Sequence, residues 1–184
     1  MKKARAFCLG LVLFCSACAA PSLRFKTEVN KLVSAGQFKQ AEEQILSKQN
    51  KYYKKKDATL FYLDRASLLH DAGQPAESDA LFASAQEYID DLYAKSITGS
   101  LGRFVINDLT APYYAANYEH ALTYYYRAVN FLEQGNLSAA AIEMRRAVFF
   151  LDELRGTKRA GYNDDPFVQY FASLIFESVG QRSD

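Results

Sequence analysis

Apolar residues recur along this chain at the spacing of amphipathic helices, from about residue 23 almost to the C-terminus. They stand three or four positions apart, which places them on one face of an α-helix. The alternation of apolar and polar residues that is typical of half-buried strands is absent from the sequence. The pattern predicts an all-α protein with helices over 23–35, 37–50, 58–72, 75–98, 117–134, 137–155 and 166–179.

Three of these helix starts carry signals of their own. Asp57 and Asn136 stand directly before a predicted helix, where a side-chain oxygen can accept a free backbone N–H. Asp165 precedes Pro166, and proline is favoured at the first helical position. We therefore expect all three residues to cap the helices that follow them.

Four glycines mark a recurring unit, and each follows a predicted helix: Gly36, Gly73, Gly135 and Gly180. Small residues stand five positions after the first three glycines, and large apolar residues nine positions after them: Ala41, Ser78 and Ala140, then Ile45, Phe82 and Met144. A tight turn between antiparallel helices favours glycine, and close helix axes need small residues with large ones nearby. The pattern predicts consecutive helix hairpins.

The unit resembles the tetratricopeptide repeat (TPR). Ala41 and Ala140 match the first small position of that repeat's second helix, and Ala85 and Ala147 match its second small position. The resemblance implies antiparallel hairpins stacked as a right-handed solenoid over residues 23–184. The glycines are spaced by 37, 62 and 45 residues, against roughly 34 in the family, which indicates inserts. A generic helical array of similar design is the alternative.

Two segments depart from this repeat. Residues 96–116 are an inserted loop between hairpins, where Asn107 and Asp108 either contact a cation or ligand or cap a turn. The chain stops four residues after Gly180, where the second helix of a fourth unit is expected. Helix 166–179 then exposes an apolar face formed by Phe167, Tyr170, Phe171 and Leu174. Either the chain is truncated or this helix docks on the preceding hairpin.

The N-terminal segment has the layout of an export signal. Basic residues open it, and an apolar run over 6–17 follows. This run is too short for the ~20 residues of a membrane-spanning helix. Cys18 comes directly after Ser16-Ala17, which resembles the lipobox of bacterial lipoproteins. The resemblance implies removal of residues 1–17, acylation (palmitate among the acyl groups) of the Cys18 thiol, and a tether over 18–22. Cleavage at the A-x-A-like site Ala17-Cys18-Ala19 to release an unanchored protein is one alternative, and an uncut segment, which would anchor the protein poorly, is the other.

The cysteines and a second resemblance indicate where in the cell the protein is located. Cys8 and Cys15 lie in the segment to be removed, which leaves Cys18 as the one thiol and no internal disulfide. Ala19 is not the Asp of inner-membrane lipoproteins, so the resemblance implies the outer membrane, facing the periplasm. Residues 62–165 are also similar to an uncharacterised group of bacterial helical-repeat lipoproteins. That similarity implies a fold and an address but no activity.

Charge and candidate chemistry exclude several classes of function. Without residues 1–17 the chain carries 19 Lys and Arg against 21 Asp and Glu, which does not suit a nucleic-acid-binding protein. The basic run 51–56 is a solvated linker or a contact with anionic lipid. His70 and His120 lie 50 residues apart without a metal-binding motif, and no nucleophile elbow is present. We expect no enzyme activity, no cofactor and no metal site.

A binding surface is the remaining hypothesis. Three successive tyrosines, 124–126, point in three directions on a helix, and they either pack in the core or contribute to a groove. The repeat alignment predicts a concave face formed by Leu63, Ser67, His70, Tyr125, Val129 and Tyr170. The expected function is a membrane-anchored scaffold or assembly factor that binds proteins in the cell envelope. The alternative is a regulatory module that binds a small molecule or cell-wall polymer in a tyrosine-rich groove.

Overall fold

The computed structural model describes residues 21–97, 111–156 and 164–180, and the regular secondary structure of these ranges is all helical. Its eight α-helices and one 3₁₀ helix (η1) pack in consecutive pairs, as the sequence predicted. Their bounds are α2 Pro21–Ser34, α3 Phe38–Ser47, α4 Gln49–Tyr52, η1 Lys55–Asp57, α5 Ala58–Asp71, α6 Pro75–Ile97, α7 Asn117–Glu133, α8 Leu137–Arg155 and α9 Pro166–Ser178. The predicted signal peptide, Cys18, Asn107 and Asp108 lie outside the described residues.

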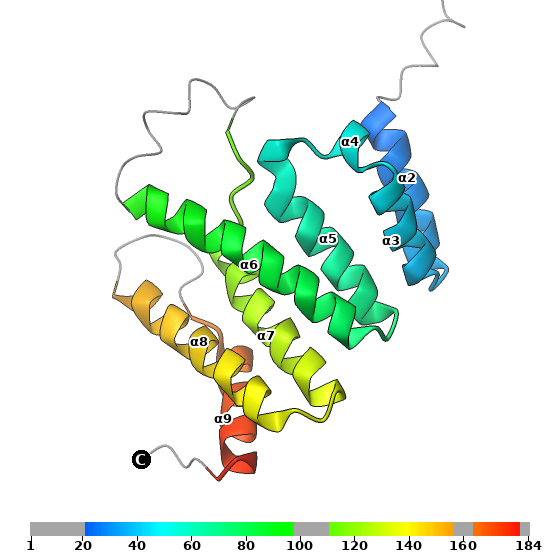
Figure 1. Ribbon diagram of the computed structural model, residues 1–184. Helices are drawn as coiled ribbons and strands as arrows, with labels where there is room; N and C mark the ends of the chain where they lie inside the picture. The colour runs from blue at the N-terminus through cyan, green and yellow to red at the C-terminus, as the bar shows by residue number, and fades with distance from the viewer. Residues whose placement is uncertain (1–20, 98–110, 157–163, 181–184) are drawn as a thin grey trace, which may run out of the picture.

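Each helix packs against its neighbours in the chain. The hairpins are α2 with α3, α5 with α6, and α7 with α8, and further contacts join α3 to α5, α6 to α7 and α8 to α9. Figure 1 shows the helices side by side in chain order, from α2 in blue to α9 in red. The first helices of neighbouring pairs also lie close together, because α2 and α5 line one hollow, α5 and α7 line another, and α7 contacts α9.

All four marked glycines adopt the left-handed backbone conformation that the bend requires, with φ between 69° and 73°. In the first three bends, the residue after the glycine donates its N–H to the carbonyl five residues earlier. These bonds are Gln37 to Leu32 at 2.9 Å, Gln74 to Leu69 at 2.9 Å and Asn136 to Phe131 at 2.8 Å. This is the Schellman arrangement that closes a helix C-terminus. The predicted hairpin turns are confirmed.

The residues aligned by their distance from the glycines form the core. Ala41, Ser78 and Ala140 are fully buried, as are the second small residues Ala85 and Ala147. The large residues Ile45, Phe82 and Met144 are buried beside them. Small side chains let two helix axes approach, and the large ones fill the space one turn away.

Two local predictions between α3 and the start of α5 are wrong. The helix predicted over 37–50 ends at Ser47, and a separate turn, α4, covers Gln49–Tyr52. The ring of Tyr52 stacks on Phe25 of α2 at 4.1 Å, a contact between distant residues that a local pattern does not contain. Asp57 makes no capping bond to α5. Its carboxylate instead accepts the N–H of Lys54, because η1 comes first.

The other two caps and the docking of the last helix are confirmed. Asn136 accepts the N–H of Ala139, and Asp165 accepts those of Phe167 and Val168. The α9 helix docks on α8 through one buried face, formed by Val168, Ala172 and Ile175. Its neighbouring face leaves three apolar side chains exposed: Phe167, Tyr170 and Leu174.

Candidate binding groove

A hollow of about 590 Å³ opens between α2 and α5. Three aromatic rings, those of Phe25, Tyr52 and Tyr53, line it among aliphatic and polar side chains. Tyr52 stacks on Phe25, and Tyr53 meets Phe25 and Phe61 edge to face at 6.5 and 5.3 Å. These rings fix the start of α5 against α2. The lining residues that the argument uses are Phe25, Lys26, Tyr53, Asp57, Leu60, Asp64 and Ser67.

A second hollow, of about 180 Å³, lies between α5 and α7. It shares Leu60, Asp64 and Ser67 with the first, so the two open along the same side of α5. On a helix these three positions stand four and three residues apart and form one stripe. We call the two hollows together the α5 groove. The lining of the second hollow is completed by Leu63 of α5, Phe82 of α6 and four residues of α7: Glu119, Leu122, Thr123 and Tyr126.

Two of the carboxylates that line the α5 groove, those of Asp64 and Glu119, each accept a tyrosine hydroxyl. Tyr53 donates to Asp64 Oδ2 at 2.6 Å, and Tyr113 donates to Glu119 Oε1 at 2.7 Å. The other oxygen of Glu119 accepts the backbone N–H of Ala116 at 2.7 Å, which caps the start of α7. Among the ion pairs of the described residues, neither carboxylate has a basic partner within 4.0 Å.

Burial shapes the protonation of these groups. Removal from water raises the pKa of the Asp64 carboxyl above its ordinary value, although the Tyr53 hydroxyl and the charge of Lys26 act against that rise. The nearby Glu119 charge raises it further. Burial and the adjacent carboxylates also raise the pKa of the Tyr53 and Tyr113 phenols, so both remain hydrogen-bond donors at neutral pH.

The structure brings part of the predicted concave face to this groove. Leu63 and Ser67 line it directly. Tyr125 lies next to the groove residue Tyr126, with ring centroids 5.3 Å apart, and also meets Phe167 and Phe171 of α9 at 5.3 and 5.0 Å. These contacts make a continuous path from the groove to the exposed apolar face of α9, which includes Tyr170.

The other two predicted residues are placed elsewhere. His70 Nδ1 lies 2.7 Å from Asn130 Oδ1, and its ring meets the edge of Tyr126 at 5.1 Å, so it joins α5 to α7. Val129 is half-buried on α7 and lines neither hollow. Of the three successive tyrosines, Tyr124 is buried and the other two are half-buried. One tyrosine of the run therefore packs in the core, and Tyr126 lines the groove.

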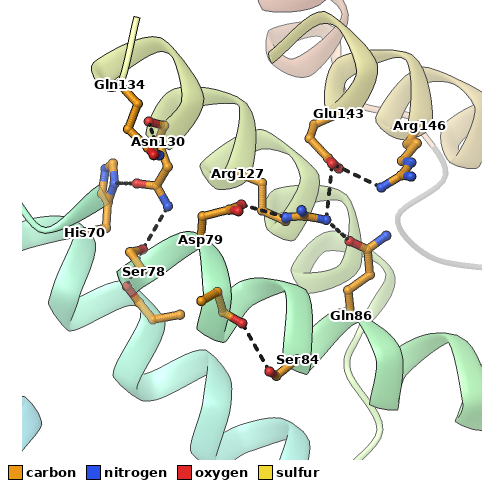
Figure 2. Close-up of polar contacts among 12 residues, drawn as sticks. His70, Ser78, Asp79, Ser84, Gln86, Arg127, Asn130, Gln134, Glu143 and Arg146 are labelled. Carbon is orange, nitrogen blue, oxygen red and sulfur yellow. Dashed lines mark hydrogen bonds and ion pairs between the residues drawn. The ribbon is translucent and has the colours of Figure 1, made fainter. Parts of the chain in front are cut away.

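A polar network holds α7 in place behind the groove (Figure 2). Arg127 of α7 donates to Asp79 at 2.8 Å and Gln86 at 2.7 Å on α6, and it lies 3.2 Å from Glu143 on α8. Burial raises the pKa of the Glu143 carboxyl, opposed by Arg127 and Arg146. Because three helices meet at Arg127, the α7 wall of the groove is set before any ligand binds.

Asn130 supplies a second link in the same network (Figure 2). Its side chain is fully buried and donates to Ser78 Oγ at 2.9 Å, while its carbonyl oxygen meets His70. Ser78 in turn donates to the backbone carbonyl of Ala66 at 2.8 Å. This chain of bonds ties α5, α6 and α7 together at the end of the groove.

Another hollow, of about 510 Å³, lies between α6 and α8 and is lined by other side chains. His120 is buried there, with Nε2 3.2 Å from Asp90 Oδ1 and 3.1 Å from the Tyr124 hydroxyl. The two histidines therefore have separate partners. In the part of the chain that is described, no group of three His, Cys, Asp or Glu residues is arranged to hold a metal ion.

The groove residues Asp64, Glu119 and Tyr53 were not identified from the sequence. A signal for Asp64 was present, because it stands three residues before Ser67 and one after Leu63, both predicted for this face. Glu119 lies 55 residues further along the chain, and only the packing of α7 beside α5 brings it to the same hollow. Tyr53 lies in the connection between α4 and η1, outside any helical pattern.

Comparisons with family models, with curated proteins and with solved structures found no match to this chain. Over the described residues, no helix combines the length and apolarity needed to cross a bilayer.

Proposed function

We propose that this protein is a binding scaffold whose α5 groove takes an extended segment of a protein partner. The observation that carries the proposal is the continuity of the groove with the exposed side chains of α9, through Tyr126 and Tyr125. Pockets that bind ligands are concave and largely apolar with a few fixed polar groups, and the groove has this character. Its walls are held by the Arg127 and Asn130 networks, so binding requires little ordering of the protein.

The same proposal includes a TPR-like right-handed solenoid, in which α2, α5, α7 and α9 line the concave side. The hairpin bends and the buried small residues support it. Stacked repeats of this kind present an extended surface to partners. From the resemblance to bacterial lipoproteins, the proposal also includes a lipid anchor at Cys18 and a location on the outer membrane, facing the periplasm. There the protein would act as an assembly factor of the cell envelope.

A photo-crosslinking amino acid at Tyr170 tests the binding surface, with the same amino acid at Phe149 as its control. Both side chains are aromatic and equally accessible, 64% and 65% exposed, but Tyr170 continues the groove face and Phe149 borders the hollow between α6 and α8. We expect crosslinks to a defined protein segment from Tyr170 and not from Phe149. Equal crosslinking from both positions contradicts the proposal.

The anchor is tested separately by replacing Cys18 with alanine and fractionating cells. We expect the wild-type protein in the outer-membrane fraction and the variant outside it, because multiple acyl chains anchor stably where one binds only marginally. An unchanged amount of the variant in the membrane fraction contradicts lipidation at Cys18 and does not affect the proposal about the groove.

A cell-wall polymer or another small molecule is the second candidate ligand. The observation that favours it is that Tyr53 and Tyr126 line the groove next to the carboxylates of Asp64 and Glu119, an arrangement of rings with polar neighbours. Crosslinking from Tyr170 to a saccharide or muropeptide fragment in place of a protein selects this candidate.

A further inference from the structure

The charge of the α5 groove distinguishes among the segments that it can accept. Three of its lining residues are acidic, Asp57, Asp64 and Glu119, and Lys26 is the one basic residue among the described lining residues. Lys26 is exposed on α2 and forms no ion pair with the groove carboxylates within 4.0 Å. The acidic lining residues therefore outnumber the basic one, and the charge of Lys26 offsets theirs only in part.

The carboxylates are also positioned for a ligand. Asp64 and Glu119 line the smaller hollow from two helices, α5 and α7; a tyrosine hydroxyl binds one oxygen of each, and the second oxygen of Glu119 accepts the N–H of Ala116. The hollow of about 180 Å³ equals the volume of about six water molecules, which is the scale of one long side chain.

We infer that the groove selects a partner segment in which a lysine or arginine side chain enters the hollow between Asp64 and Glu119. The inference rests on the proposed function and names the chemistry of the partner. A cation there pairs with two partly desolvated carboxylates, and charge-assisted hydrogen bonds are the strong ones. Apolar residues on either side of it then contact Phe25 and Tyr53 at one end and α9 at the other. An acidic segment is repelled.

Peptide binding to the purified protein tests this selection. The probes are fluorescein-labelled ten-residue peptides with an apolar frame of Leu and Tyr and one central residue: Lys, Arg, norleucine or Glu. Norleucine keeps the length of lysine without its charge. We expect Lys and Arg peptides to bind at least about tenfold more tightly than the norleucine peptide, and the Glu peptide to bind most weakly. Raising the salt concentration should reduce the difference.

Asp64→Asn is the decisive variant, and Asp71→Asn is its matched control on the same helix. Asparagine keeps an oxygen that can accept the Tyr53 hydroxyl and removes a charge that burial disfavours, so the variant should be at least as stable at neutral pH. Asp71 is exposed and lines neither hollow. We expect Asp64→Asn to lose the preference for Lys over norleucine and Asp71→Asn to retain it. Urea unfolding of each variant verifies the fold.

The outcomes separate this inference from the proposed function. If norleucine and Lys peptides bind equally, or if Asp64→Asn keeps the preference, the inference is overturned while peptide binding stands. If no peptide binds and Tyr170 yields no protein crosslink, both are overturned. Loss of the Lys preference in Asp64→Asn alone supports both.

Discussion

Replacing Gly135 by alanine perturbs one hairpin bend without any steric contact. Gly135 has φ 73°, and a Cβ added there meets no atom within 4 Å. The cost is therefore conformational: an L-residue in the left-handed region loses about 1–2 kcal/mol, offset in part because alanine restricts the unfolded chain. We expect a net loss of about 1 kcal/mol in the free energy of unfolding, which lowers the thermal midpoint by roughly 2–4 °C. Urea and thermal unfolding followed by circular dichroism measure both quantities.

Gly156→Ala is the control for this experiment. Gly156 follows α8 with φ −69° and ψ −13°, a conformation that alanine adopts freely, and an added Cβ lies 3.4 Å from the nearest atom, the carbonyl oxygen of Glu153. Its stability should be unchanged or higher by up to about 1 kcal/mol. If Gly135→Ala is as stable as the wild type, or if both variants lose the same free energy, the left-handed glycine is not what closes the hairpin. The argument from the repeated glycines then fails.

Two further predictions concern buried polar groups. Asn130→Ala removes the bonds to His70 and Ser78 and leaves a buried cavity, so urea unfolding should show a loss of about 2–4 kcal/mol. A loss below about 0.5 kcal/mol contradicts the bridging role. Burial raises the pKa of Tyr124 to about 12, above the ordinary value of about 10. Its contribution to stability is thus present below pH 10 and lost as the pH rises from 10 to 12. Tyr124→Phe should be less sensitive to pH over that window, and equal sensitivity of the two proteins contradicts the assignment.

The extent of the helices was predictable because their signals are local. Helix period, the glycine bends and the caps at Asn136 and Asp165 depend on residues within a few positions of each other, and the structure matches the predicted bounds within three residues. The break at Lys48 was missed because the stacking of Tyr52 on Phe25 joins residues 27 positions apart. Propensity and pattern do not contain such a tertiary contact.

The candidate site was predictable only as a face. Helical phase identified the stripe of α5 that contains Leu63 and Ser67, because one repeat aligned with the next. The helical periodicity does not show which polar side chain on that stripe is shielded from solvent. Asp64 does so because Tyr53, from the connection before α5, covers it. The sequence assigned no role to Glu119, the second carboxylate of the smaller hollow. The distance between Glu119 and Asp64 depends on how two hairpins pack.

One face of α7 holds the neighbouring helices together, and another face lines the groove. Glu119, Leu122, Thr123 and Tyr126 follow one another at helical spacing and line the groove, whereas Arg127 lies one position further round and binds α6 and α8. Arg127 neutralises buried acids inside the protein, and its removal leaves charges without partners. Asp64 and Glu119 differ from the acids around Arg127, because among the described residues they accept tyrosine hydroxyls and have no ion-pair partner. Arg127 thus pairs with acids on one face of α7, whereas the described residues give Asp64 and Glu119 on the groove side no ion-pair partner within 4.0 Å. This difference between the two faces supports the proposal that the groove binds a positively charged group.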